Sequence, residues 1–268
     1  MRCLRFRFDH GQNEENGVEE IVQDQYNNVR DVLDSCRGVY TVLKVVDVDD
    51  VQFHTNRLCK GYTLLGGESE IQKRSLLIQR VLFHSMERFS QEYNGILCLI
   101  PISGDLSMNM YGMNTSPRPI NCSMDVGLSF NGGCRSLPNA KDSKWSMDRR
   151  EIEQTFVNVI TRDILLMDPE SSALYEGLLT NVFVLLENRK VQTAPSEYVL
   201  EGCARQGLLD KLERKGFRIL YECANWCERD SWRGMYLTNS LRGIEWVDRI
   251  LDEHGMVLKS FSRQFDLL

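Results

Sequence analysis

The sequence predicts an α+β protein, with a small α/β domain followed by a larger domain of mixed strands and helices. Three observations predict this class. Short runs rich in β-branched residues recur along the chain, few segments carry a helical period, and the glycine-rich fingerprint of dinucleotide-binding sheets is absent. A chain of 268 residues, 42% of them hydrophobic, is long enough to bury the cores of two such domains.

Composition narrows the classes of partner and compartment. The net charge of -6 argues against a broad nucleic-acid-binding surface. Apolar runs such as 96–102 are shorter than the roughly 20 residues that cross a bilayer, so no membrane segment is expected. Nine cysteines without regular pairing predict free thiols in a reducing compartment. We therefore expect a cytoplasmic protein, with an organellar transit segment as the alternative.

The chain is expected to divide into three parts. Residues 1–34 form a polar arm, residues 35–120 a small α+β domain, and residues 121–268 the large domain. The proposed boundary falls in the Pro- and Asn-bearing segment 114–121, because such residues mark loops. Cys223 and Cys227 offer two thiols and no second pair at ligand spacing, so no metal site is expected.

Hydrophobic periodicity places the elements within these parts. The small domain is expected to contain a hairpin of two strands, a helix and a buried strand, over 39–46, 51–53, 70–93 and 95–102. The large domain is expected to contain strands over 125–130, 163–167, 179–186, 190–192, 218–221 and 234–238, with helices over 145–159 and 205–215.

Four polar features follow one another in the large domain. Lys141 ends the segment Asn-Ala-Lys, and Glu176 stands in Tyr-Glu-Gly-Leu-Leu-Thr-Asn, which leads into a strand. The segment Leu-Glu-Gly-Cys-Ala-Arg at 200–205 opens a helix, and Leu-Thr-Asn-Ser at 237–240 ends a strand. Each alone is an ordinary loop or strand end. Their occurrence together, in this order, indicates a single functional site.

These features resemble the class IV pyridoxal-phosphate family of branched-chain aminotransferases, D-amino acid aminotransferases and aminodeoxychorismate lyases. The resemblance runs from about residue 35 to 247, and includes Gly-Val-Tyr-Thr-Val at 38–42 and His-Thr-Asn-Arg-Leu at 54–58. It looks closest to plant-type uncharacterised members, which share D/E-S-C-x-G-x-Y-T and K-x-S-x-W-x-x-x-R. The resemblance implies fold type IV with a barrel-like large domain carrying the lysine, pyridoxal 5'-phosphate as cofactor, and a homodimer.

The resemblance also implies roles for single residues. Lys141 forms the internal aldimine with the cofactor aldehyde and moves the proton at the substrate Cα, with Lys144 as the alternative. Glu176 keeps the pyridine nitrogen protonated, so that the ring accepts electrons, and Asn181 supports the site. The alternative for Glu176 is a glutamate in a surface turn.

The cofactor phosphate needs backbone N–H donors at a helix start and a cation. Arg57 resembles the family's phosphate arginine, with a solvated arginine as the alternative. The expected backbone donors lie in the helix start and a second turn, at Gly202, Cys203, Ala204, Ser240 and Leu241. The family usually has Gly-Ile-Thr-Arg where this chain has Gly-Cys-Ala-Arg, so one hydroxyl contact is missing.

The substrate side is expected to involve a specificity loop within 103–119 and Tyr40, which resembles an active-site tyrosine of several relatives. The alternative for Tyr40 is a half-buried aromatic residue of a strand. Arg118 in that loop is a candidate for binding a substrate carboxylate, with a rim arginine as the alternative. Ser146 stands where many branched-chain members have a tyrosine, which argues against branched-chain substrates. His54 and Trp145 are expected to be packing residues.

The expected reaction is transamination between an amino acid and a 2-oxo acid. The first alternative is a lyase of the aminodeoxychorismate type, which uses the same lysine and glutamate in a differently shaped pocket. The second is a pseudoenzyme without cofactor that acts as a binding or assembly protein.

Overall fold

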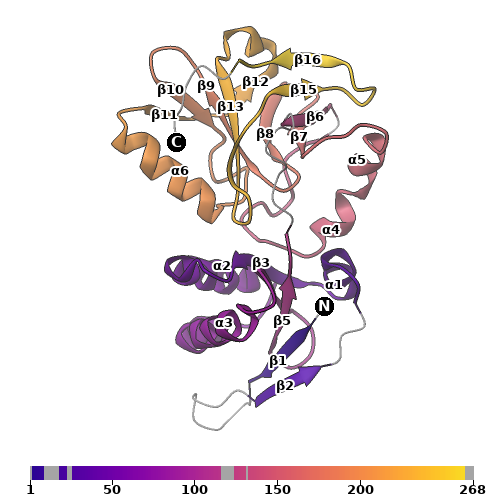
Figure 1. Cartoon of the computed structure of the whole chain (residues 1–268), viewed down its shortest axis with the longest axis vertical. Coiled ribbons are helices and arrows are strands. Elements are labelled where there is room, and N and C mark those ends of the chain that lie inside the picture. The colour runs from indigo at the N-terminus through magenta and orange to yellow at the C-terminus, as the bar shows by residue number, and fades with distance from the viewer. Residues whose placement is uncertain (1, 9–17, 23–25, 116–123, 131, 263–268) are drawn as a thin grey trace. The chain divides into compact units, whose positions relative to one another are not determined.

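A computed structural model describes residues 2–8, 18–22, 26–115, 124–130 and 132–262. The chain forms two compact units, residues 1–116 with 140–148, and residues 117–139 with 149–268 (Figure 1). The segment 140–148, which contains Lys141, therefore belongs with the first unit, whereas the sequence assigned it to the large domain. Within the described residues, no helix has the length and apolar character needed to span a membrane.

The first unit is built on one antiparallel sheet with the strand order β2-β1-β5-β4-β3. Its strands are β1 (Cys3–Arg7), β2 (Val18–Val22), β3 (Gly38–Lys44), β4 (Gly95–Pro101) and β5 (Ser107–Met113). Its helices are α1 (Val29–Ser35), α2 (Val51–Leu64), α3 (Ser75–Phe89) and α4 (Trp145–Asp148), with 3₁₀ turns η1 (Val48–Asp50) and η2 (Ser69–Arg74).

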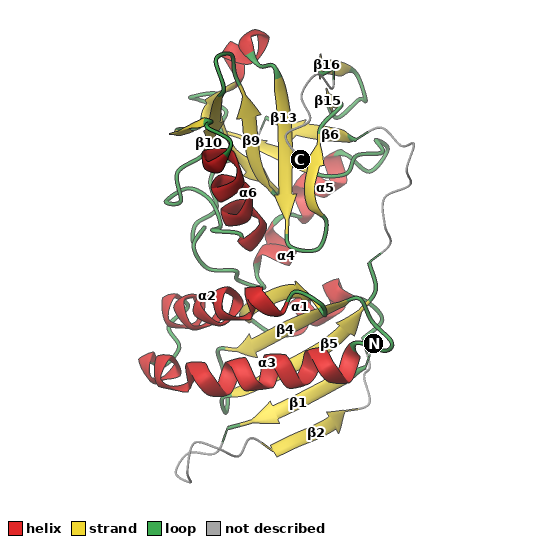
Figure 2. Ribbon diagram, turned by 60° about the vertical axis from the view of Figure 1, so that its left-hand side comes forward, coloured by secondary structure: helices red, strands yellow, loops and turns green. Residues whose placement is uncertain are grey.

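Alternation along the strands gives this sheet two buried faces. Ile96 and Ile100 of β4 pack with α2 and α3, while Leu97 and Leu99 between them pack with α1. Figure 2 shows α2 and α3 lying side by side over the sheet. Because successive side chains of a strand point to opposite faces, Tyr40 and Thr41 of β3 belong to different layers. The predicted buried strand and the helix preceding it are confirmed as β4 and α3.

Three expectations for this unit are corrected. The run 51–53, expected as a strand, begins α2, because Val51, Thr55 and Leu58 are buried at helical spacing. Within the arm expected over 1–34, β1 is an inner strand of the sheet, and Leu4 is fully buried. Part of the expected specificity loop, 107–113, forms β5.

The second unit contains a large mixed sheet, in which β8, β9 and β13 are adjacent antiparallel strands. Its strands are β6 (Asp125–Ser129), β7 (Ile164–Met167), β8 (Ala173–Gly177), β9 (Asn181–Leu185), β10 (Lys190–Thr193), β11 (Arg218–Tyr221), β12 (Ala224–Asn225), β13 (Gly234–Asn239), β14 (Gly243–Trp246), β15 (Arg249–Leu251) and β16 (Val257–Ser260). Its helices are α5 (Arg150–Thr155) and α6 (Cys203–Arg214), with the 3₁₀ turn η3 (Trp226–Ser231).

Helix α6 packs against this sheet through Leu208, Leu209 and Leu212. The predicted helix over 205–215 is thereby confirmed, with its start two residues earlier. The helix expected over 145–159 is two short helices, α4 and α5, which belong to different units. Helix α5 ends where Phe156 turns inward, and its ring lies so close to Gly127 that a Cβ there would be 2.5 Å from it.

Candidate functional site

The segment that carries Lys141 is fixed to strand β3 by its backbone. The Tyr40 amide donates to the Lys141 carbonyl over 2.9 Å, and Val39 and Asp142 form an antiparallel bridge. Since β3 is otherwise an edge strand, these bonds satisfy backbone groups that would remain unpaired. The two motifs that carried the family resemblance, around residues 34–41 and 141–149, therefore contact one another.

Ser143 anchors the same segment from its other end. Its hydroxyl accepts from the Gly38 amide over 3.0 Å and donates to the Cys36 carbonyl over 2.9 Å, and its side chain is fully buried. Gly38 has to be glycine here, because a Cβ would lie 2.4 Å from the Ile100 carbonyl oxygen. A serine at position 143 and a glycine at position 38 thus hold the Lys141 backbone in one conformation.

The two lysines considered for the site differ in their surroundings. Lys141 is half-buried, and its Nζ lies 4.9 Å from the centre of the Tyr40 ring. That distance is within the range of cation–π attraction. Lys144 is 50% exposed and forms an ion pair with Asp148, one helical turn away. The fold therefore places Lys141 against a buried aromatic ring, and Lys144 at the surface.

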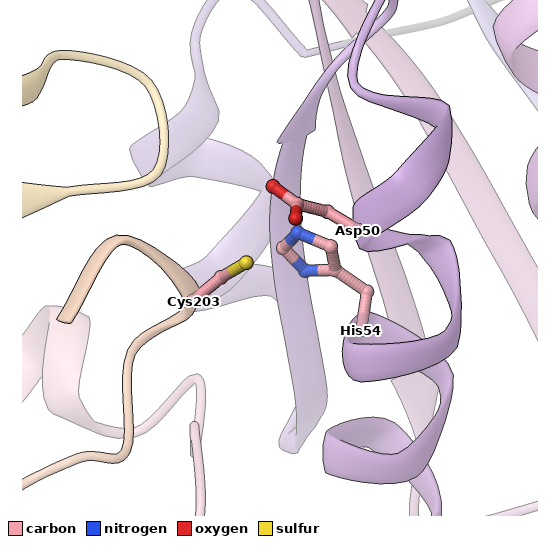
Figure 3. A group of neighbouring side chains, drawn as sticks. All are labelled: Asp50, His54 and Cys203. Carbon is pink, nitrogen blue, oxygen red and sulfur yellow. The ribbon is translucent and has the colours of Figure 1, made fainter. Parts of the chain in front are cut away.

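Arg57, His54 and Thr41 form a buried hydrogen-bonded cluster between α2 and β3. Arg57 donates to the Thr41 hydroxyl, and its Nη2 lies 3.1 Å from His54 Nδ1. The Thr41 hydroxyl is 2.7 Å from the same His54 nitrogen. Because Arg57 has no acceptor to offer, His54 Nδ1 accepts and the imidazole proton resides on Nε2. Figure 3 shows His54 on the first turn of α2, near Asp50.

Burial and, to a smaller extent, the positive charges of Arg57 and Lys141 together lower the pKa of His54 to about 2. A pKa lowered this far keeps the buried imidazole neutral near pH 7. Sequence reasoning identified His54 as a packing residue, and its burial agrees with that. It did not identify the hydrogen bonds to Arg57 and Thr41, although the H-x-x-R spacing places both side chains on one face of a helix.

A row of buried polar residues crosses three strands of the second unit. Glu176 of β8 pairs with Asn181 of β9, which pairs with Thr238 of β13. Directly opposed residues of antiparallel strands share one face of the sheet, so the three side chains lie side by side. They are 3%, 6% and 2% exposed. The sequence had Glu176 in a loop before a strand, whereas it lies on a strand.

Glu176 is held by an arginine that the sequence analysis did not select. Arg135 places its Nε and Nη2 2.6 Å from Glu176 Oε1, and the Leu200 amide donates to Oε2 over 3.2 Å. Asn181 donates to the Leu200 carbonyl over 2.7 Å. Leu200 therefore joins Glu176 to Asn181. Arg135 and Glu176 are 41 residues apart, and no local pattern pairs them.

The turn between Glu176 and Asn181 is built around a buried carboxylate. Asp163 accepts from the Thr180 hydroxyl over 2.7 Å and from the Leu179 amide over 3.2 Å. Burial raises the pKa of Asp163, while Arg242 and these donors lower it. A Cβ on Gly177 would lie 2.4 Å from the Thr180 hydroxyl. This packing explains the Gly and the Thr of the motif, since the turn needs both to close.

Among the described residues, no side chain caps the start of helix α6. Gly202 is its N-cap in an extended conformation, and Cys203 and Ala204 are the first two helical residues. The amide groups of such a start are donors for an anion. Cys203, drawn in Figure 3, is buried at this position. A Cβ on Gly202 would lie 2.6 Å from Asn181 Oδ1, so the helix start contacts the polar row.

Two further predicted residues occupy a turn, one lies outside the described residues, and Arg205 of the quoted motif lies on α6. Ser240 and Leu241 form the turn between β13 and β14, where the Leu241 amide donates to Asn239 Oδ1 over 2.9 Å. Arg205 is buried and donates to the Ala194 carbonyl over 2.9 Å. Arg118 falls in the segment 116–123 and is not described.

Thr238 was quoted in the sequence motif but not selected as a site residue. Its hydroxyl is buried, and within the described residues no hydrogen-bond partner reaches it. Predicted residues and the residues that contact them thus form two groups, each within one unit. The Lys141 group consists of Tyr40, Thr41, His54, Arg57 and Lys141, and the Glu176 group consists of Arg135, Glu176, Asn181 and Thr238 with the α6 start.

Comparison with known proteins gives a likeness of fold. No family model matches the sequence, and no curated protein matches it either. A fold IV-transaminase from Curtobacterium pusillum superposes with a TM-score of 0.73 at 13% identity, over 98% of this chain and 93% of its own. An aminotransferase from Brucella abortus, solved with bound pyridoxal phosphate, gives 0.69 at 14% identity, over 99% and 95%.

A third structure, of a candidate 4-amino-4-deoxychorismate lyase from Legionella pneumophila, gives a TM-score of 0.69 at 15% identity. It covers 90% of this chain and 91% of its own. The sequence left two reactions open, transamination and lyase action. Proteins named for each of them have this fold. The chain has the α+β architecture predicted for it, and its fold is that of the fold-IV transaminases.

Proposed function

We propose that this protein binds pyridoxal 5'-phosphate and transfers amino groups between an amino acid and a 2-oxo acid. The observation that carries the proposal is the placement of Lys141, whose backbone is fixed by β3 and whose ammonium lies against the Tyr40 ring. A lysine that attacks an aldehyde and later moves a proton must be held in a defined position. Lys144, paired with Asp148 at the surface, lacks such a setting.

The Glu176 group fits the polar parts of the cofactor. The uncapped start of α6 offers backbone donors for a phosphate. The Glu176 carboxylate, contacted by Arg135 and the Leu200 amide, would accept a hydrogen bond from the pyridine N–H. The Thr238 hydroxyl, which has no hydrogen-bond partner among the described residues, would supply one more polar contact. Cys203 and Ala204 provide no hydroxyl where relatives have threonine, so the backbone donors would hold the phosphate.

When bound, the cofactor supplies an electron sink that makes the substrate Cα–H acidic. The protein's part is to hold and move protons. Lys141 would take the proton from the substrate Cα and return it, as a general base and then a general acid. Glu176, kept charged by Arg135, would retain the proton on the pyridine nitrogen. Arg57 would contribute positive charge for the phosphate.

The proposal is tested by product analysis of the cofactor-loaded protein. The protein is incubated with L- and D-amino acids and a 2-oxo acid, and mass spectrometry measures amino-group exchange between an isotope-labelled donor and the acceptor. We expect exchange that Lys141→Ala abolishes and Lys144→Ala leaves intact. Pyruvate release from aminodeoxychorismate without any exchange would instead establish the lyase. No exchange, no lyase activity and no bound cofactor would leave the pseudoenzyme interpretation.

A further inference from the structure

A single buried arginine contacts the Glu176 carboxylate through two nitrogens. Arg135 directs two nitrogens at one oxygen, Oε1, each over 2.6 Å. The other oxygen, Oε2, accepts one longer bond, of 3.2 Å, from the Leu200 amide. The side chains of Arg135 and Glu176 are 10% and 3% exposed. Arg135 thus contacts Oε1 of Glu176, whereas the Leu200 amide contacts Oε2.

Because the ion pair is buried, Arg135 strongly affects the protonation state of Glu176. An unpaired carboxylate in a site excluded from water takes up a proton, because desolvation disfavours its charged form. Charged and titratable groups face Glu176 from three elements. Arg135 and Cys134 approach from the loop after β6, the Leu200 amide from the loop before α6, and Arg205 from α6, where its positive charge interacts with Glu176. Arg135 is the cation of this set that is in direct contact.

We propose that Arg135 is a positioning residue, which keeps Glu176 ionised and holds its carboxylate in place to accept from the pyridine N–H of the cofactor. This inference rests on the proposed function and adds a residue to its site. An ionised Glu176 accepts a hydrogen bond from the protonated nitrogen, whereas a protonated Glu176 would donate to an unprotonated one. Arg135 thereby selects between the two protonation states without touching the cofactor nitrogen itself.

The test compares two ligands that differ at the ring nitrogen alone, pyridoxal phosphate and its 1-deaza analogue, in which a carbon replaces that nitrogen. The ratio of their dissociation constants measures what the nitrogen contributes, because the aldehyde and phosphate are common to both. A hydrogen bond to a charged group predicts a preference for pyridoxal phosphate of about 10- to 100-fold in the unmodified protein. Absorbance titration gives both constants without any turnover.

Four variants and one control assign that preference. We expect Glu176→Gln and Arg135→Gln to reduce the ratio to about one, and the double variant to reduce it no further than Glu176→Gln alone. Arg135→Lys keeps the positive charge but loses the planar guanidinium that places two nitrogens at one oxygen. We therefore expect an intermediate ratio of dissociation constants. The matched control is Arg233→Gln, which removes an exposed arginine–glutamate pair of the same unit and should keep the full preference.

A second measurement covers the case in which Arg135→Gln folds poorly. Without its partner, Glu176 would be a buried unpaired carboxylate, and the stability lost in Arg135→Gln should be larger at pH 8 than at pH 5. The double variant, which removes both charges, should regain stability at pH 8 in urea denaturation.

The outcomes separate the two proposals. Full preference in both Arg135→Gln and Arg135→Lys, with preference lost in Glu176→Gln, would overturn the role of Arg135 and leave the proposed function standing. Failure of the unmodified protein to bind either ligand would overturn the proposed function itself.

Discussion

Gly38 and Ser143 are joined by two hydrogen bonds although 105 residues separate them in sequence. The Gly38 amide donates to the Ser143 hydroxyl over 3.0 Å, and the Ser143 amide donates to the Gly38 carbonyl over 2.9 Å. Through them, the segment that contains Lys141 pairs with β3 of the first unit. The position of Lys141 therefore depends on Gly38 and Ser143, two residues to which the proposed reaction assigns no role.

Replacing Ser143 by alanine tests that dependence. The change removes the acceptor of the Gly38 amide and the donor to the Cys36 carbonyl at a fully buried position. An unsatisfied buried group costs about 1–3 kcal/mol, so we expect a loss of unfolding free energy of that size in urea denaturation. Ser90→Ala, at an exposed helix end, is the control and should be nearly neutral. Equal effects of both changes would contradict this account.

Gly38→Ala tests the same pairing of the two segments by adding a side chain where Gly38 packs closely against β4. The added Cβ would lie 2.4 Å from the Ile100 carbonyl oxygen, so β3 has to shift away from β4. Overpacking of this kind costs about 1–3 kcal/mol, measurable by urea denaturation. Gly207, which lies in α6, is the control, because a Cβ added there meets only open space. Gly104 is unsuitable as a control, because its φ of +84° is itself unfavourable for alanine. Gly207→Ala should stabilise slightly.

His54 predicts a pH dependence of stability. Its pKa is lowered to about 2 in the folded protein, whereas an unfolded histidine titrates near 6.5, so below that pH the unfolded chain binds a proton that the folded one does not. The contribution of neutral His54 to the free energy of unfolding is therefore complete above pH 6.5. Below that pH, it falls by up to about 1.4 kcal/mol per pH unit. His54→Gln should flatten the stability profile between pH 7 and 5, and the exposed His254→Gln should not. If the unmodified protein, His54→Gln and His254→Gln gave parallel profiles of stability against pH, the low pKa of His54 would be contradicted.

Thr238→Val should have opposite effects on the empty and loaded protein. The buried hydroxyl lacks a partner among the described residues, so its replacement by a methyl group should raise the unfolding free energy of the cofactor-free protein by about 1 kcal/mol. If the hydroxyl contacts pyridoxal phosphate, affinity for the cofactor should fall about threefold to tenfold. Thr180→Val is the contrasting variant, since Thr180 donates to Asp163 and its loss should destabilise. A destabilising Thr238→Val would show that the hydroxyl has a partner.

Much of the fold could be predicted where burial is continuous or strictly periodic. The all-apolar β4 and the amphipathic α3 and α6 are such elements. Strand β5 was missed because its sequence, Ser-Met-Asn-Met-Tyr-Gly-Met, lacks β-branched residues and gains its pairing from β1 and β4. The run at 51–53 has strand propensity, which the burial pattern of α2 overrides.

The site divides in the same way. Lys141, Glu176 and Asn181 could be selected because they stand in local motifs with recognisable order. Arg135 could not, because its pairing with Glu176 is long-range and the residues around it form no pattern. The ion pair of Lys144 with Asp148 was predictable in principle, since the residues are four apart on a helix and carry opposite charges. That the segment 140–148 belongs to the first unit follows from its backbone bonds with β3, which sequence alone does not reveal.

The most direct test of the central claim is the identity of the lysine that reacts with the cofactor. The protein is incubated with pyridoxal phosphate, reduced with borohydride and digested, and the phosphopyridoxyl mass is located by tandem mass spectrometry. We predict the label on Lys141 in the unmodified protein and in Lys144→Ala, and its loss in Lys141→Ala. A label on Lys144, or one spread over several surface lysines, would contradict the account.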